Sequence, residues 1–164
     1  MKIFIETDLE GISGISKIEQ VADRDEYTLA RLMCDTNAAV RGFLDGGADE
    51  VLVRDGHGGG NNFPEGALDT RAKQITYHDE FIDECDAVCV VGAHSMAGTE
   101  NAFLDHTQSS VAWHDYYING RRLGEMGQLG AFAGAHGKPF IMMSGDLSAA
   151  AGARACFRCI ETPV

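Results

Sequence analysis

Short apolar runs alternate with longer stretches of helical periodicity along this chain, and no other feature constrains its fold as strongly. The apolar runs are the expected strands, at residues 2–6, 51–53, 87–91, 113–118 and 139–143. Helices are expected between them, at residues 24–45, 124–136 and 148–156, with a short helix or turn at 79–86. Such alternation is typical of α/β proteins with a parallel sheet. The pattern therefore predicts an α/β fold, a three-layer sandwich around a mostly parallel sheet.

Several of these elements have recognisable ends. The helix at 24–45 carries a repeat at three- and four-residue spacing, formed by Ala30, Met33, Asn37, Val40 and Leu44, and Gly46-Gly47 follows as a helix stop. Asn119-Gly120 comes after the strand at 113–118 and is a strong signal for a type I′ hairpin. Because no internal repeat or linker divides the sequence, we expect residues 1–164 to form one domain.

Composition excludes several classes of protein. Of the 164 residues, 45% are hydrophobic and 8% are aromatic, which excludes an intrinsically disordered chain. The 13 Lys and Arg against 25 Asp and Glu give a net charge of −12, which repels nucleic acid and anionic membrane surfaces. No uncharged apolar run reaches the ~18–20 residues of a membrane span, and the first residues lack the apolar stretch of a signal peptide. Five cysteines, an odd number, then suggest reduced thiols in a cytoplasmic protein.

Acidic and histidine residues follow three of the expected strands, at the point where each strand ends. They are Asp8 and Glu10, Asp55 and His57, and His94. In open parallel sheets, ligands bind just beyond the carboxyl ends of the strands. If these strands are neighbours, their polar ends meet at one edge of the sheet, and this edge is the expected site.

Each of these groups has more than one interpretation. In extended backbone Asp8 and Glu10 point to the same face, where they can share a cation, but they also fit an ordinary acidic loop. His57 lies in a glycine-rich loop and suits a metal ligand or a plain loop residue. The Gly58–Gly60 stretch can also cradle a phosphate, although it lacks the Lys-Ser/Thr of a P-loop. His94 repeats the setting of His57, with a hydrogen-bonded turn histidine as its alternative.

The remaining polar candidates lie outside the strand ends. Glu125 falls at an expected helix N-terminus, where it is either a ligand or a plain cap. Asp105-His106 does not by itself establish a catalytic pair, and surface positions are expected for His78, His114 and His136. A structural or incidental role is expected for Cys156 and Cys159, because no second pair completes a zinc site. Core positions are expected for Cys85 and Cys89.

Two histidines and the paired carboxylates together suit zinc, and a carboxylate can bridge two ions. In this combination the chain resembles the D-aminopeptidases of the dipeptide-transport type, a family of dinuclear zinc peptidases. The most specific matches are the D-x-E-G-I-S-G opening at residues 8–14 and the segment Y-I-N-G…G-E-x-G at 117–127. Residues 50–57 with Asn61-Asn62, Gly92-Ala93-His94 and Asp105-His106 also match, in the same order.

The resemblance implies a role for each matched residue. Asp8 would bridge two zinc ions, with Glu10 and His94 completing one and His57 and Glu125 completing the other. His106 matches the family's catalytic histidine, for which we expect proton transfer rather than direct attack. Two zinc ions ~3.5–4 Å apart lower the pKa of a shared water toward ~7 and polarise the scissile carbonyl.

The expected function is therefore that of a zinc-dependent aminopeptidase acting on N-terminal, D-configured residues of short peptides or amides. The resemblance also implies a ring-like homo-oligomer. Because family chains are longer, residues 1–164 are expected to form the N-terminal, catalytic part of the family fold, with a second chain as one source of the rest. The alternatives are a metal-dependent amidase for another small amide, and a non-catalytic nucleotide- or phosphate-binding module using the Gly58–Gly60 loop.

Overall fold

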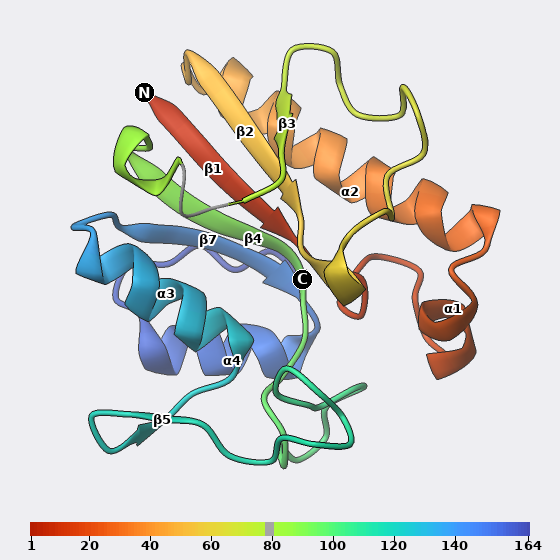
Figure 1. Cartoon of the computed structure of the whole chain (residues 1–164), viewed down its shortest axis with the longest axis vertical. Coiled ribbons are helices and arrows are strands. Elements are labelled where there is room, and N and C mark those ends of the chain that lie inside the picture. Colours follow the sequence, from red (N-terminus) through yellow and green to blue (C-terminus); the bar gives the residue numbers. More distant parts are fainter. Residues whose placement is uncertain (78–80) are drawn as a thin grey trace.

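The computed structural model describes residues 1–77 and 81–164, and its centre is a five-stranded sheet (Figure 1). The strand order is β3-β2-β1-β4-β7, and every pair of neighbours in this sheet is parallel. The strands are β1 (Lys2–Thr7), β2 (Glu50–Asp55), β3 (Lys73–Ile75), β4 (Ala87–Ala93) and β7 (Phe140–Gly145). A separate hairpin consists of β5 (Tyr117–Ile118) and β6 (Arg121–Arg122).

The central strands are buried on both faces, since successive side chains of a strand point to opposite sides. In β1, Ile3 and Ile5 belong to one apolar core and Phe4 to the other. In the neighbouring β2, Val51 and Val53 lie on the side of the two isoleucines, while Leu52 lies on the side of Phe4. This explains why the expected strands are continuous apolar runs rather than alternating ones.

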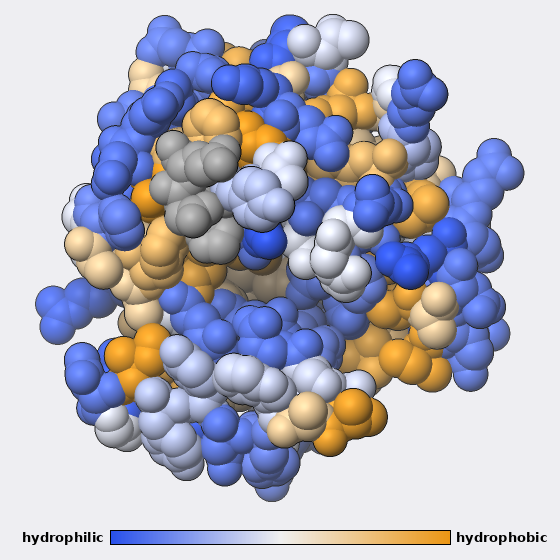
Figure 2. Space-filling view, viewed as in Figure 1, coloured by the Kyte–Doolittle hydropathy of each residue, from blue (hydrophilic) through white to orange (hydrophobic). Residues whose placement is uncertain are grey.

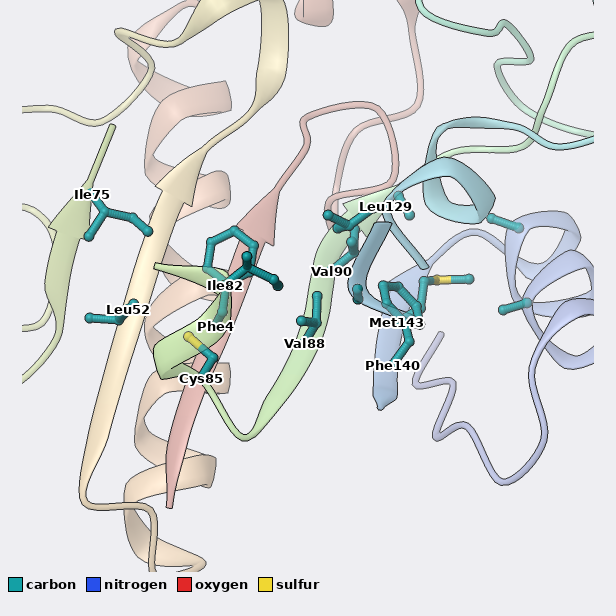
Figure 3. Packing of buried hydrophobic residues seen from close by; sticks show 14 of the residues in the cluster. Phe4, Leu52, Ile75, Ile82, Cys85, Val88, Val90, Leu129, Phe140 and Met143 are labelled. Atoms are coloured by element: carbon teal, nitrogen blue, oxygen red, sulfur yellow. The ribbon is translucent and has the colours of Figure 1, made fainter. Parts of the chain in front are cut away.

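Helices cover both faces of the sheet, so the predicted three-layer α/β architecture is confirmed (Figure 1). One face packs against α1 (Ile18–Asp23) and α2 (Glu26–Asp45), which contribute Val21, Leu32, Met33 and Val40 to the core. The other face packs against α3 (Glu125–Ala135) and α4 (Leu147–Cys156). Figure 3 shows this second core, in which Phe4, Leu52 and Val88 line the sheet and Leu129 lies beside Val90.

The expected helix at 24–45 is found as α2, which begins two residues later, at Glu26. Arg24 has a left-handed backbone, with φ of 48°, and ends α1, so the chain turns there before α2 begins. The side chain of Asp25 then caps α2 by accepting a hydrogen bond from the Thr28 amide. Of the expected apolar repeat, Met33 and Val40 are buried as predicted, whereas Ala30 is exposed and Leu32 is buried in addition.

The expected strand at 113–118 is wrong over most of its length. Only its last two residues pair with another strand, as β5. The hairpin itself is confirmed, since Asn119 and Gly120 both have positive φ, as a type I′ turn requires. Of the expected element at 79–86, the structure describes the 3₁₀ turn η2 (Ile82–Glu84); His78 and residues 79 and 80 lie outside the described residues.

The remaining expected helices and strands agree with the structure to within two residues at their ends, whereas α1 and β3 were not among the expected elements. All five cysteines are free, and Cys85 and Cys89 are buried in the core as expected. Within residues 1–77 and 81–164, no helix combines the length and apolar character that a membrane span needs.

Candidate metal centre

The side chains that follow β1, β2 and β4 meet at the carboxyl-end edge of the sheet. Backbone hydrogen bonds tie these ends together, from the Asp8 amide to the Val91 carbonyl at 2.8 Å and from the Gly56 amide to the Thr7 carbonyl at 3.1 Å. Gly92 contributes to the same close packing: it has φ of 86°, and a Cβ there would lie 2.2 Å from the Asp8 carbonyl oxygen. Backbone contacts alone therefore fix the ends of β1, β2 and β4 relative to one another.

Asp8 lies between two histidines. Its Oδ1 is 3.1 Å from His57 Nδ1, and its Oδ2 is 3.4 Å from His94 Nε2. Each carboxylate oxygen thus faces a different imidazole, one from the loop after β2 and the other from the end of β4. A carboxylate in this position is able to contact two cations at once, one through each oxygen.

Glu10 enters the same cluster although the backbone has left the extended conformation of β1. Its Oε2 is 3.1 Å from His57 Nδ1, its Oε1 is 4.0 Å from His106 Nε2, and its side chain is only 6% exposed. The turn that directs Glu10 inward passes directly against β4, since a Cβ on Gly11 would lie 2.1 Å from the Ala93 carbonyl oxygen. The two carboxylates of the D-x-E motif converge because of this turn rather than because of strand geometry.

Glu125 is the first residue of α3 and reaches the cluster from the opposite side. Its Oε1 is 3.2 Å from His94 Nε2 and 3.5 Å from His106 Nε2. The same oxygen accepts a 2.7 Å hydrogen bond from the backbone amide of Gln108. The position at a helix N-terminus also favours its negative charge.

The imidazole of His94 is oriented for metal binding. Its Nδ1 lies 2.8 Å from the Ser95 carbonyl oxygen, which can only accept, so Nδ1 carries the proton and Nε2 is left facing the carboxylates. The His94 side chain is 2% exposed, and Nε2 has no hydrogen-bond partner among the described residues. A buried, unpaired nitrogen between carboxylate oxygens calls for a proton or a metal ion, and a dication fits this position.

His57 is held by its own loop, which includes the short 3₁₀ turn η1 (His57–Gly59). Asn62 donates from its side-chain amide to the His57 carbonyl oxygen at 2.7 Å and to Asp55 Oδ1 at 2.8 Å. Asp55 also accepts from the Asn62 backbone amide, and Arg24 donates to the Asn62 side-chain oxygen at 3.1 Å. Asp55 therefore braces the His57 loop and is not itself part of the cluster.

The ring of His106 stacks on that of His94, with centroids 3.9 Å apart and planes 8° apart. The loop that carries it is attached to the segment after β4, where the His106 amide donates to the Ser95 carbonyl at 3.3 Å and the Ala97 amide donates to Thr107 Oγ1 at 3.2 Å. His106 is more accessible than His94, at 21% side-chain exposure against 2%.

Burial and opposite charges shift the pKa values of the residues in the cluster. Burial lowers the pKa of His57, but its hydrogen bonds with Asp8 and Glu10 outweigh this and raise that pKa to about 10. Burial also lowers the pKa of His94, but its interaction with Glu125 outweighs this effect and the pKa rises to about 9. Burial also raises the pKa of Asp8 to about 7.

The same charges also shift the pKa values of Glu10, Glu125 and His106. Burial raises the pKa of Glu10, but its contacts with His57 and Asp8 prevail and the net pKa is lowered. The pKa of Glu125 is likewise lowered, because its interactions with His94 outweigh burial. For His106, burial and the charge of His94 together lower the pKa below its usual value.

The structure thus brings together all six residues that the sequence marks as site residues. Three overlapping groups have ligand atoms close enough to hold an ion: Asp8, Glu10 and His57; Asp8, His94 and Glu125; and Glu10, His94 and His106. Histidine nitrogen and carboxylate oxygen are the donors that zinc takes in catalytic sites, so the residues present fit that metal.

Each glutamate has its shortest histidine contact with a different ring, Glu10 with His57 and Glu125 with His94. The pairing implied by the resemblance instead puts Glu10 with His94 and His57 with Glu125. Glu10 and His94 do share a group, with His106 as its third member.

Two cavities meet at this cluster. One, of about 330 Å³, is lined by Asp8, His94 and Glu125. The other, of about 370 Å³, is lined by Glu10, His57 and His106. The face that is shown in Figure 2 is mostly hydrophilic and is hollowed near its middle. The candidate centre is therefore open to small ligands from two sides.

Other polar residues of interest lie elsewhere or were not anticipated. Asp105 accepts a hydrogen bond from the Gly98 amide and does not pair with His106, while His114 is 77% exposed, as expected. Sequence reasoning missed Gln108, whose backbone amide holds Glu125. Its positive φ of 63° has no recognisable signal in the sequence. In the sequence, the Asn61-Asn62 pair belongs to the resemblance but has no assigned role.

Comparisons with known proteins agree with this geometry. The chain matches the model of a family described as D-aminopeptidase over residues 1–164. It is 29% identical over 160 residues to a D-aminopeptidase of Bacillus subtilis (strain 168), covering 92% of this chain and 58% of that protein. It also superimposes, with a TM-score of 0.91 and 27% identity, on the Zn-dependent D-aminopeptidase DppA of Bacillus subtilis, described as a self-compartmentalizing protease. That match covers 99% of this chain and 62% of the solved one, so the chain spans about three fifths of the length of these relatives.

Proposed function

Because the chain belongs to the D-aminopeptidase family, which it matches over residues 1–164, we propose that it is a zinc-dependent aminopeptidase that removes N-terminal, D-configured residues from short peptides or amides. The observation that carries this proposal is the position of Asp8. Its two oxygens face His57 and His94, and the Nε2 atom of His94 is buried without a hydrogen-bond partner among the described residues.

We assign two zinc ions to the cluster, with Asp8 as the shared ligand. Following the family resemblance, Glu10 and His94 would complete the first ion and His57 and Glu125 the second. Among the described residues, Glu10 and His94 share a group of ligand atoms with His106, while His57 and Glu125 each share a group with Asp8.

When bound, the two ions supply an activated water and a polarised carbonyl at neutral pH. The residues of the protein orient the ligands and transfer the proton. The hydrogen bond of Ser95 keeps the His94 proton on Nδ1, and the Gln108 amide fixes the carboxylate of Glu125. His106 lies beside the carboxylates of Glu10 and Glu125 and lines the second cavity. There it can hold a proton and deliver it to the leaving amine.

The assembly of the protein is part of the same proposal. DppA of Bacillus subtilis is described as self-compartmentalizing, and we propose that this chain also works in a homo-oligomer. Size-exclusion chromatography with light scattering tests this directly, since a monomeric active species would contradict it.

A panel of D- and L-alanyl amides, assayed with and without chelator, tests the proposed activity. We expect hydrolysis of the D-amide, loss of activity after chelation and recovery on addition of zinc. Preference for the L-amide would indicate a general amidase activity in place of a D-aminopeptidase activity. Turnover that survives complete zinc removal would overturn the proposal.

A further inference from the structure

His106 comes from a long irregular segment between β4 and the β5–β6 hairpin, which lies at the bottom of Figure 1. Residues 94–116, all of which the structure describes, form no helix and no strand longer than one residue. An isolated parallel bridge pairs Ser95 with Asp105, the residue before His106. Since no regular element carries His106, individual hydrogen bonds decide where its ring lies.

The backbone of Ala97 connects the segment of His106 to the hairpin. The Ala97 amide donates to Thr107 Oγ1 at 3.2 Å, and Thr107, which directly follows His106, is buried. The Ala97 carbonyl accepts a hydrogen bond from Nη2 of Arg122, in β6. Ala97 thus uses one backbone group toward the neighbour of His106 and the other toward Arg122.

Arg122 is itself held in place by a second partner. Its Nε forms an ion pair with Oδ1 of Asp115, in the segment before β5. The guanidinium also lies against Gly98, where the φ is 76° and an added Cβ would be 3.2 Å from Nη2. A planar guanidinium with two partners in fixed directions orients a carbonyl more firmly than a freely rotating ammonium group does.

The Arg122 contacts lie beside the start of α3 and outside the central sheet. Gly124 allows the chain after β4 to pass close by, since a Cβ there would lie 2.5 Å from Met96 Cβ, and Glu125 is the next residue. The β5–β6 hairpin is not part of the five-stranded sheet. Loss of the Arg122 contacts should therefore disturb the loop of His106 while the sheet and its two cores stay intact.

We infer that Arg122 is a positioning residue for His106. It acts through Ala97 and Thr107, and the result is the stacked position of the His106 ring, with its centroid 3.9 Å from that of His94. The inference rests on the proposed aminopeptidase activity, in which His106 moves a proton. A displacement of about 1 Å at such a group lowers a rate by up to about 100-fold.

Arg122→Met removes both contacts and keeps a side chain of similar width. For the zinc-loaded protein we expect kcat on a D-alanyl amide to fall by about 10- to 100-fold, with little change in KM and unchanged zinc content. Arg122→Lys retains a charged donor and should recover part of the loss. Arg121→Met, the same change at the exposed neighbouring position of β6, is the control and should keep wild-type kcat.

Combination with His106→Ala distinguishes positioning from a general structural role. If Arg122 acts through His106, Arg122→Met should cause no further loss of kcat in a protein that already lacks this histidine. Additive losses overturn the inference and leave the proposed activity intact, as does an unchanged kcat in Arg122→Met alone. If Arg122→Met does not fold, Thr107→Val cuts the same connection at its other end and replaces it in both comparisons.

A second measurement needs no turnover. In the stacked arrangement the His106 ring protons lie over the ring of His94, so the ring current moves their NMR signals upfield, and His106→Ala identifies these signals by their loss. In zinc-loaded Arg122→Met they should move toward the positions of an unstacked histidine, whereas Arg121→Met should leave them unchanged. If no amide is hydrolysed, the proposed activity fails and this shift alone decides. His106 signals that are the same in Arg122→Met and in the wild-type protein overturn the positioning role.

Discussion

His94 and His106 stack face to face, with ring centroids 3.9 Å apart and planes 8° apart. They come from different segments, one at the end of β4 and the other from the loop that precedes the β5–β6 hairpin. The buried ring directs its free nitrogen at two carboxylates, while the more exposed ring lines the second cavity. The contact thus joins a residue proposed to bind zinc to a residue proposed to move a proton.

His106→Ala separates these two roles. Because we assign His106 to proton transfer and not to metal binding, the variant should lose about 100- to 10,000-fold in kcat while keeping its zinc. Zinc analysis and kinetics on the same preparation measure both quantities. His114→Ala, at a largely exposed histidine, is the control and should retain full activity. Joint loss of zinc and activity in His106→Ala would contradict the assignment.

Asn62→Ala tests how the loop after β2 holds His57. Removal of the Asn62 side chain leaves the His57 carbonyl and Asp55 without their partner, so we expect zinc affinity to fall by about 10- to 100-fold. Competition with a chromophoric chelator measures this affinity. The control is Asn61→Gly in the same loop, where glycine suits the φ of 66°. Unchanged zinc affinity in Asn62→Ala would show that the loop does not position the ligand.

Gly92→Ala tests the close approach of β1 and β4. The new Cβ would meet the Asp8 carbonyl and force a left-handed alanine, so the free energy of unfolding should fall by about 2 to 4 kcal/mol. Gly134→Ala is the control in α3, where nothing lies within 4 Å of the added Cβ. That variant should gain about 0.5 to 1 kcal/mol from the better helix propensity of alanine. Urea denaturation distinguishes the two, and equal stability of both variants would contradict the tight packing of the strand ends.

The metal-free protein should lose stability as the pH rises. The folded protein raises the pKa of His57 to about 10 and that of His94 to about 9, from a usual value of 6.5. Groups whose pKa is raised by folding stabilise fully below the unfolded value, and this contribution disappears as the pH rises through the folded value. Melting temperatures of chelated protein between pH 6.5 and 9 measure the slope.

His57→Gln should flatten that slope, because the variant lacks one of the two titrating groups. The zinc-loaded protein should not lose stability in the same way, since metal binding requires unprotonated imidazoles. If the stability of the chelated protein instead increases over this pH range, the raised pKa values of His57 and His94 are contradicted.

Much of the fold and the site followed from local sequence patterns. Apolar runs that end in Asp or His located three neighbouring strands, and the carboxyl ends of parallel strands must share an edge, so Asp8, His57 and His94 were expected together. Glu125 and His106 were different. They reach the cluster from a helix start and a long irregular loop, and only the family resemblance connected them with the strand ends.

Other features depend on tertiary contacts that have no periodic signal. Arg24 ends α1 in a left-handed conformation that arginine rarely adopts, so the sequence placed the helix start at this residue instead of at Glu26. The segment before Tyr117 has strand-like residues but pairs with no strand in the described part of the chain, and pairing decides whether such a segment becomes a strand. The support that Gln108 gives to Glu125 comes from a backbone amide, which leaves no trace in residue type.

The number of zinc ions per chain tests the central claim most directly. We expect equilibrium dialysis followed by elemental analysis to find about two zinc ions per wild-type chain. Asp8→Asn should bind fewer than one under the same free zinc, because Asp8 is assigned to both ions, while the exposed Asp23→Asn should still bind two. One zinc ion or none in the wild-type chain, or two in Asp8→Asn, would contradict the shared-carboxylate centre.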